Sequence, residues 1–139
     1  MNEYKYADIQ AGQSEHFSVT VTEAMMDAFC AVSGDTNPLH VSDEFAQSKG
    51  FDKRVVYGML TASFYSQLAG VHLPGKNCLL QELEISFSKP VFAGDCLTVT
   101  GKVTEKNDLF KRIVIKAEVR NQAGDKVSKA KIKAGVMDE

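Results

Sequence analysis

The amino-acid sequence predicts an α+β fold in which an antiparallel sheet wraps around one long buried helix. Residues 55–75 contain no Asp, Glu, Lys or Arg, yet they include Thr61, Ser63 and Pro74. This composition is typical of a helix buried inside a protein and is too polar for a membrane span. The pattern then changes to a period of two, and four such segments follow with turn residues between them. Four consecutive strands of this kind indicate an antiparallel meander.

Length and composition are those of one globular domain, which we expect to cover residues 1–139. The chain has 44% hydrophobic and 24% charged residues, which are ordinary values for a folded domain. Its net charge of −2 provides no electrostatic attraction to nucleic acid or to an anionic membrane. The sequence opens without a basic and apolar leader, and its three cysteines lack C-x-x-C spacing. We therefore expect a cytoplasmic protein without a metal site.

The first expected elements are a strand and a helix. Polar and apolar side chains alternate over residues 16–21, which indicates a strand. Thr22 is a suitable N-cap, apolar residues then recur at helical spacing, and Gly34 fits the position just after a helix. Residues 38–54 predict an irregular segment with one short turn around residues 43–49.

The second half supplies the buried helix and the sheet. We expect the uncharged helix over about residues 58–69. The four strands are expected within residues 79–88, 96–103, 110–120 and 126–136. In the last of them, lysines alternate with Ala130, Ile132 and Ala134. This alternation is typical of a solvated sheet face, with attraction of a phosphorylated ligand as the alternative.

The segment S-G-D-T-N-P-L-H-V, residues 33–41, is the first candidate for chemistry. Taken singly, Asp35 is more typical of an Asx turn or a cap, and His40 of a solvated or structural residue. Pro38, however, stiffens the connection and biases Asn37 away from the helical region. Such a loop can direct two titratable side chains into one space. An imidazole titrates near neutral pH and a carboxylate can orient or deprotonate a water, so the pair is a candidate proton-transfer site.

The segment V-V-Y-G-M-L-T-A-S, residues 55–63, is the second candidate. Gly58 at the start of the buried helix leaves its backbone N–H free, and the helix dipole adds positive potential there. This arrangement suits an oxygen that gains negative charge, such as a thioester carbonyl that becomes an enolate. The alternative is that Gly58 only permits close packing. Ser66, two turns along, is either a core serine bonded to a helix carbonyl or a polar group facing the pocket.

The first segment, extended to F-C-A-V-S-G-D-T-N-P-L-H-V-S-D-E-F-A (residues 29–46), resembles the signature of the MaoC-like, R-specific enoyl-CoA hydratases. It fills every fixed position of [S/T]-G-D-x-N-P-[L/I/V]-H. Y-G-M-L-T-A-S-F-Y-S (57–66) and S-F-S-K-P-V-F-A-G-D (86–95) extend the resemblance over most of the chain, from about Phe17 onward. The resemblance implies the hotdog fold, a helix wrapped by an antiparallel sheet.

The resemblance also implies catalytic roles. Asp35 and His40 match the family's catalytic pair, which together hold one water. Gly58 matches the glycine whose N–H binds the thioester oxygen. The implied reaction is the reversible syn addition of water to trans-2-enoyl-CoA, which gives (R)-3-hydroxyacyl-CoA. Acyl-CoA is then the substrate, and no cofactor is expected.

Three further residues are expected at the substrate site on the same grounds. Ser66 matches a serine that supports the active-site hydrogen bonds. Asn37 matches the motif asparagine, which we interpret as shaping the loop. Tyr57 stands where many relatives have His, which alters the pocket wall and leaves the acyl-chain preference open.

The sequence leaves two other functions open. The same motif suits dehydration of 3-hydroxyacyl groups on acyl carrier protein, and a non-catalytic acyl-thioester binder is a further reading. Either carrier needs a basic contact, for which the candidates are Lys49, Lys53, Arg54 and Lys89. Hotdog domains usually pair, so we expect a homodimer or a dimer of dimers. The pathway, whether polyhydroxyalkanoate precursor supply or fatty-acid breakdown, is open.

Overall fold

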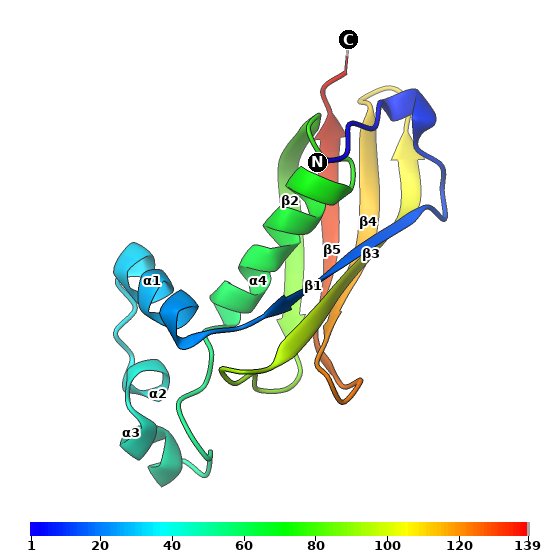
Figure 1. Cartoon of the computed structure of the whole chain (residues 1–139). Helices are drawn as coiled ribbons and strands as arrows, with labels where there is room; N and C mark the ends of the chain where they lie inside the picture. The colour runs from blue at the N-terminus through cyan, green and yellow to red at the C-terminus, as the bar shows by residue number, and fades with distance from the viewer. Residues whose placement is uncertain (139) are drawn as a thin grey trace.

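Five antiparallel strands form one sheet in the order β1-β3-β4-β5-β2 (Figure 1). The computed structural model describes residues 1–138, so the expected domain of residues 1–139 includes one residue outside the described part. The strands are β1 (Ser14–Thr20), β2 (Cys78–Phe87), β3 (Cys96–Asn107), β4 (Arg112–Arg120) and β5 (Lys126–Val136). Strands β1 and β2 form the two edges of the sheet.

The order of the strands corrects the predicted meander in one place. Strands β3, β4 and β5 do pair consecutively, but β2 pairs with β5, with Cys78 opposite Val136 and Phe87 opposite Ser128. The segment between β2 and β3 therefore crosses the end of the sheet, and the Val56 N–H donates to its Val91 carbonyl at 2.8 Å. A period of two identifies strands by their faces, but it carries no information about which strands become neighbours.

The helices lie in two groups. The structure has η1 (Tyr6–Asp8), α1 (Glu23–Ser33), α2 (Pro38–Val41), α3 (Asp43–Ser48), α4 (Gly58–Gln67) and a π-helical turn, η2 (Leu68–His72). Helix α4 lies along one face of the sheet, whereas α1, α2 and α3 stand beyond its first turn, away from the strands (Figure 1). The α+β architecture with a central helix is thus as predicted.

The ends of α1 follow the predicted signals. The Thr22 hydroxyl accepts the Met25 N–H at 3.1 Å, and Gly34 closes the helix in the left-handed region with φ 72°. The expected irregular segment 38–54 contains α3 where a turn was predicted, but it also contains α2. Periodicity does not detect a helix of four residues, whose only signals are the Asn37 cap and a proline at its start.

The contact between α4, η2 and the sheet is close. Leu60, Phe64, Tyr65 and Leu68 belong to one hydrophobic cluster with Ile113, Ile115 and Ile132. A Cβ added to Gly101 of β3 would lie 2.7 Å from Leu68 Cδ2 and 2.9 Å from Ile115 Cγ2. Glycine is therefore required at this position of β3 for the helix to reach the sheet.

The prediction that this helix is buried on all sides holds only for the side that faces the sheet. Met59, Ser63, Ser66 and Gln67 are exposed, and their spacing places them on one side of α4. A sheet of five strands covers one side of a helix, so an apolar helix can still present a small polar stripe. Among residues 1–138, no helix combines the length and hydropathy needed to cross a bilayer.

Candidate active site

The loop from Ser33 to His40 is held by a chain of side-chain to backbone hydrogen bonds. The Asp35 N–H donates to Ser33 Oγ at 3.1 Å, and the Asn37 N–H donates to Asp35 Oδ1 at 3.0 Å. Asn37 Oδ1 in turn accepts the Leu39 N–H at 2.9 Å and so caps α2. Each is a short-range turn bond of the kind that Asp and Asn favour. Asp35 engages one carboxylate oxygen in this turn, and the loop itself is exposed.

The His40 ring has a defined hydrogen-bond partner. Its Nδ1 lies 2.7 Å from the Val55 carbonyl oxygen. Because a carbonyl only accepts, Nδ1 carries the proton, and in the neutral ring Nε2 is the nitrogen that can accept one. A second bond joins the same two segments, with the Val55 N–H donating to the Leu39 carbonyl at 3.0 Å. The segment before α4 thus fixes both the position and the tautomer of His40.

Tyr57 contacts both members of the pair. Its ring stacks on the His40 ring with centroids 4.2 Å apart, and its hydroxyl donates to the Asp35 carbonyl at 2.7 Å. The residue is only 1% exposed. Burial, together with the nearby Cys30 and Asp35, raises the pKa of the phenol to about 12, so the hydroxyl remains a donor at neutral pH.

Gly58 is the first residue of α4. In residues 1–138 its N–H donates to no other backbone group, as expected of the first N–H groups of a helix. The Phe87 ring packs beside the Cα of Gly58, since a Cβ added there would lie 3.4 Å from two ring carbons. Phe87 itself is 50% exposed. The N–H is therefore available to a ligand at a boundary between protein and solvent.

Two hollows meet at this point. One of about 280 Å³ is lined by Asp35, His40 and Gly58, together with Phe29, Ser33, Tyr57, Met59 and Phe87. The other, of about 400 Å³, shares His40, Gly58 and Phe87 and continues over Thr61 to Lys89. The structure thus brings all three predicted catalytic residues to one hollow. The combination of a titratable pair with a free N–H at a helix start is suited to proton transfer beside an oxygen that gains charge.

The other predicted site residues lie differently. Tyr57 lines the smaller hollow, whereas Asn37 and Ser66 line neither. Asn37 caps α2 through its bond to Leu39, and its role in shaping the loop for the site stays a prediction. Ser66 is exposed on α4, two turns from Gly58, and its contribution to the site stays a prediction.

Sequence reasoning missed two parts of the site. The Val55 carbonyl that holds His40 is a backbone group, and no residue type signals such a role. Phe87 lies in a segment expected as a strand and Phe29 in one expected as a helix, and nothing in either segment marks the residue as part of a site. Both aromatic rings reach the hollow because the fold places the ends of β2 and α1 beside the start of α4. The spacing of residues within each element does not predict that these three elements come together.

The four candidate basic residues have different partners. Arg54 lies 3.4 Å from the Asp27 carboxylate, and Lys53 donates to the Ala93 carbonyl at 2.9 Å. Lys49 lies over the Phe45 ring, 5.3 Å from its centroid. Of the four, Lys89 is the one that lines a hollow next to His40. Its ammonium lies 3.4 Å from the exposed Asp125 carboxylate, a weak solvated pair.

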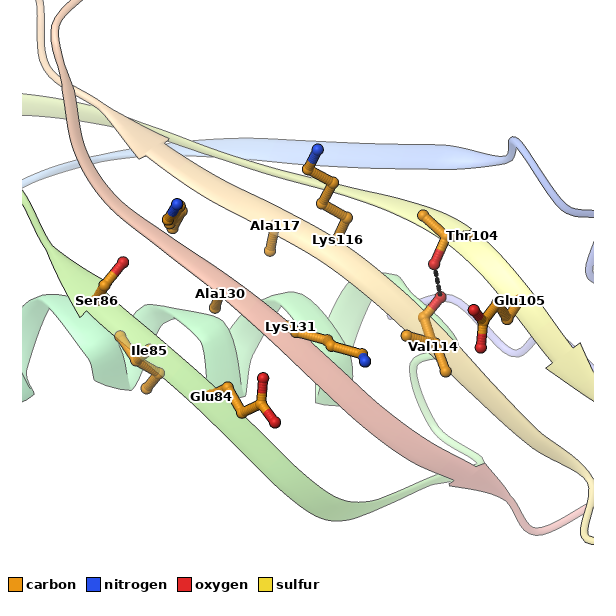
Figure 2. A pocket seen from close by; sticks show the side chains of 11 residues that line it. Glu84, Ile85, Ser86, Thr104, Glu105, Val114, Lys116, Ala117, Ala130 and Lys131 are labelled. Atoms are coloured by element: carbon orange, nitrogen blue, oxygen red, sulfur yellow. Dashed lines mark hydrogen bonds between the residues drawn. The ribbon is translucent and has the colours of Figure 1, made fainter.

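A larger hollow of about 450 Å³ lies on the sheet and is separate from this site (Figure 2). It is lined by β2 to β5, with Glu84 and Glu105 among Lys116, Lys129 and Lys131. None of the predicted site residues lines it. Over the described residues, no group of three or more His, Cys, Asp or Glu side chains is placed to hold a metal ion.

The chain is similar to several known proteins. The family model described as "MaoC like domain" matches residues 7–125. The chain is 39% identical over 105 residues to the (R)-specific enoyl-CoA hydratase of Rhodospirillum rubrum, covering 73% of each chain. It is 41% identical over 96 residues to the (R)-specific enoyl-CoA hydratase of Aeromonas caviae, covering 69% of this chain and 72% of that one. The solved structure of the R-hydratase PhaJ1 from Pseudomonas aeruginosa matches with a TM-score of 0.91 and 31% identity, over 97% of this chain and 86% of that one.

Proposed function

The chain belongs to the MaoC-like domain family, and we propose that it is an R-specific enoyl-CoA hydratase. It is a hydro-lyase that adds water reversibly to trans-2-enoyl-CoA and gives (R)-3-hydroxyacyl-CoA. The observation that carries this proposal is the hollow lined by Asp35, His40 and Gly58 together. The names of the relatives that match over about three quarters of their length support the same substrate.

The chemistry needs a nucleophile at C3, a proton at C2 and a group that stabilises the enolate. A water held between the Asp35 carboxylate and His40 Nε2 supplies the oxygen for C3. As that bond forms, the water loses a proton to the pair, and the pair delivers a proton to C2. The Gly58 N–H donates to the thioester oxygen while it carries the enolate charge. Delivery from one side of the double bond makes the addition syn.

The acyl carrier is assigned from the basic residues near the site. Lys89, which lines the hollow of about 400 Å³ beside His40, is the candidate for contact with a CoA phosphate. The alternative is an acyl-carrier-protein substrate, since the thioester and the reaction are the same. Three free cysteines support a reducing compartment such as the cytoplasm.

A hydration assay tests the proposal. Trans-2-enoyl-CoAs from C4 to C12 are offered to the protein, loss of enoyl absorbance is followed, and the product is analysed on a chiral column. We expect hydration of at least one of these substrates with the R product only. Hydration of acyl-carrier-protein substrates alone would support the alternative, and an S product would contradict the proposal.

We further propose that the chain forms a homodimer, either alone or in a dimer of dimers. Strand β2 is an open edge, and the exposed apolar residues Leu79, Leu80, Phe87 and Met59 lie on β2 and on α4. A second copy placed there would pair with the β2 edge and cover Ser66. Proteins commonly pair or cover exposed strand edges in this way. Light scattering after size exclusion tests this: Leu80→Glu should yield monomers, and a wild-type monomer would contradict it.

A further inference from the structure

Tyr57 has more contacts with the catalytic loop than a pocket wall requires. Its hydroxyl donates to the Asp35 carbonyl at 2.7 Å, and its ring stacks on His40 at a centroid distance of 4.2 Å and an interplanar angle of 28°. On the side toward α1 it packs against Phe29, with centroids 4.9 Å apart. One buried side chain therefore contacts the backbone of one member of the pair and the ring of the other.

The same residue also precedes the proposed enolate donor. Tyr57 is the N-cap of α4, so the peptide bond that follows it contains the Gly58 N–H. Its backbone is held as well, because the Leu60 and Thr61 N–H groups both donate to the Tyr57 carbonyl, at 3.1 and 3.2 Å. Tyr57 therefore contacts Asp35 and His40 directly, and it is joined to the Gly58 N–H by a peptide bond.

We propose that Tyr57 is a positioning residue, which sets Asp35 and His40 at a fixed place relative to the Gly58 N–H. This inference rests on the proposed function. Around Asp35 the loop is exposed and is otherwise held by short-range turn bonds. At its other end, Leu39 and His40 are bonded to Val55. The turn bonds shape the loop internally but do not join Asp35 to the start of α4. The Tyr57 hydroxyl joins the two, and a displacement of about 1 Å at a reacting group can cost about 100-fold in rate.

The choice of tyrosine fits this role. A phenol joins an aromatic face, which can stack on an imidazole, to a hydroxyl at the far end of the ring. Cys30 Sγ also approaches the Asp35 carbonyl, at 3.5 Å, but a thiol is a weak donor. The phenol hydroxyl is therefore the stronger of the two donors to that carbonyl.

Tyr57→Phe tests the proposal because it removes the hydroxyl and keeps the stacked ring. We expect kcat for crotonyl-CoA hydration to fall about tenfold, the rate factor obtained if the net free energy of one hydrogen bond is lost from the transition state, with KM changed by less than about twofold. Since the role acts through Asp35, the same substitution in an Asp35→Asn background should leave the residual rate unchanged. A purely structural role would lower the rate by the same factor in both backgrounds.

Tyr65→Phe is the matched control. Tyr65 lies on the same helix, is 0% exposed, and donates its hydroxyl to Ser128 Oγ at 2.9 Å, away from both hollows. Thermal unfolding should show similar small losses of stability for the two variants, while kcat falls only for Tyr57→Phe. Full activity of Tyr57→Phe, or equal losses of kcat in both variants, would overturn the inference. Absence of hydration by the wild-type protein would instead overturn the proposed function.

Discussion

At the scale of single residues, the loop of residues 33–40 combines turn formation and the proposed chemistry in the same side chains. Asp35 Oδ1 accepts the Asn37 N–H, which leaves the second carboxylate oxygen for a water. His40 uses Nδ1 to contact the Val55 carbonyl, which leaves Nε2. In both residues one polar atom fixes the side chain and the other is available, so the turn and the site are one structure.

A substitution at Gly58 can remove one backbone N–H without removing a side chain. Proline is well tolerated at the first position of a helix, and Tyr57 before it has ψ 129°, an extended value that proline favours in its predecessor. Gly58→Pro should therefore fold but lose the N–H. We expect hydration to slow by about 100-fold or more, as for loss of one oxyanion donor, in a steady-state assay.

Gly58→Ala is the control for that variant. It also adds a Cβ, which would lie 3.4 Å from the Phe87 ring, an ordinary contact, and it keeps the N–H. Its rate should stay within about tenfold of the wild-type rate, since no donor is lost. Equal rates for the proline and alanine variants would exclude the N–H as the group that stabilises the enolate.

At the scale of elements, the sequence predicted the secondary structure of each segment better than the position of that segment in the fold. The Thr22 cap and the Gly34 end of α1 were readable because capping bonds are local. The pairing of β2 with β5 was not readable, because it depends on a crossing segment and on packing across the whole sheet. The site divides in the same way: Asp35 and His40 lie in one motif, whereas Phe87 comes from a distant strand.

The close approach of η2 to β3 yields a prediction for stability. Gly101→Ala would place a methyl group 2.7 Å from Leu68 Cδ2, so the helix or the strand must shift. We expect a loss of about 1–3 kcal/mol in the free energy of unfolding, as for other overpacked cores, measured by urea denaturation. Gly70→Ala is the control, since nothing lies within 4 Å of its added Cβ, and a loss as large as that of Gly101→Ala would refute the steric explanation.

At the scale of the whole molecule, buried tyrosines link stability to high pH. Burial raises the pKa values of Tyr6, Tyr57 and Tyr65 to about 12. The unfolded chain releases these protons near pH 10, whereas the folded chain keeps them. Their contribution is therefore complete below pH 10 and is lost as the pH rises toward 12.

Tyr65→Phe isolates one of these three groups. Above pH 10 the free energy of unfolding of the wild-type protein should fall relative to that of the variant by about 1.4 kcal/mol per pH unit. Urea denaturation of both proteins between pH 9 and pH 11.5 measures this difference. A difference that does not change with pH would mean that the Tyr65 phenol titrates alike in the folded and unfolded states.

The proposed catalysis depends on proton transfer by Asp35 and His40, at the meeting point of the loop and α4. The most direct measurement is the rate of crotonyl-CoA hydration, followed by loss of enoyl absorbance, for the wild-type protein, Asp35→Asn and His40→Ala. We expect each substitution to lower turnover by about 10²–10⁴-fold, the usual contribution of general acid–base catalysis. Near-normal rates in both variants would contradict the mechanism.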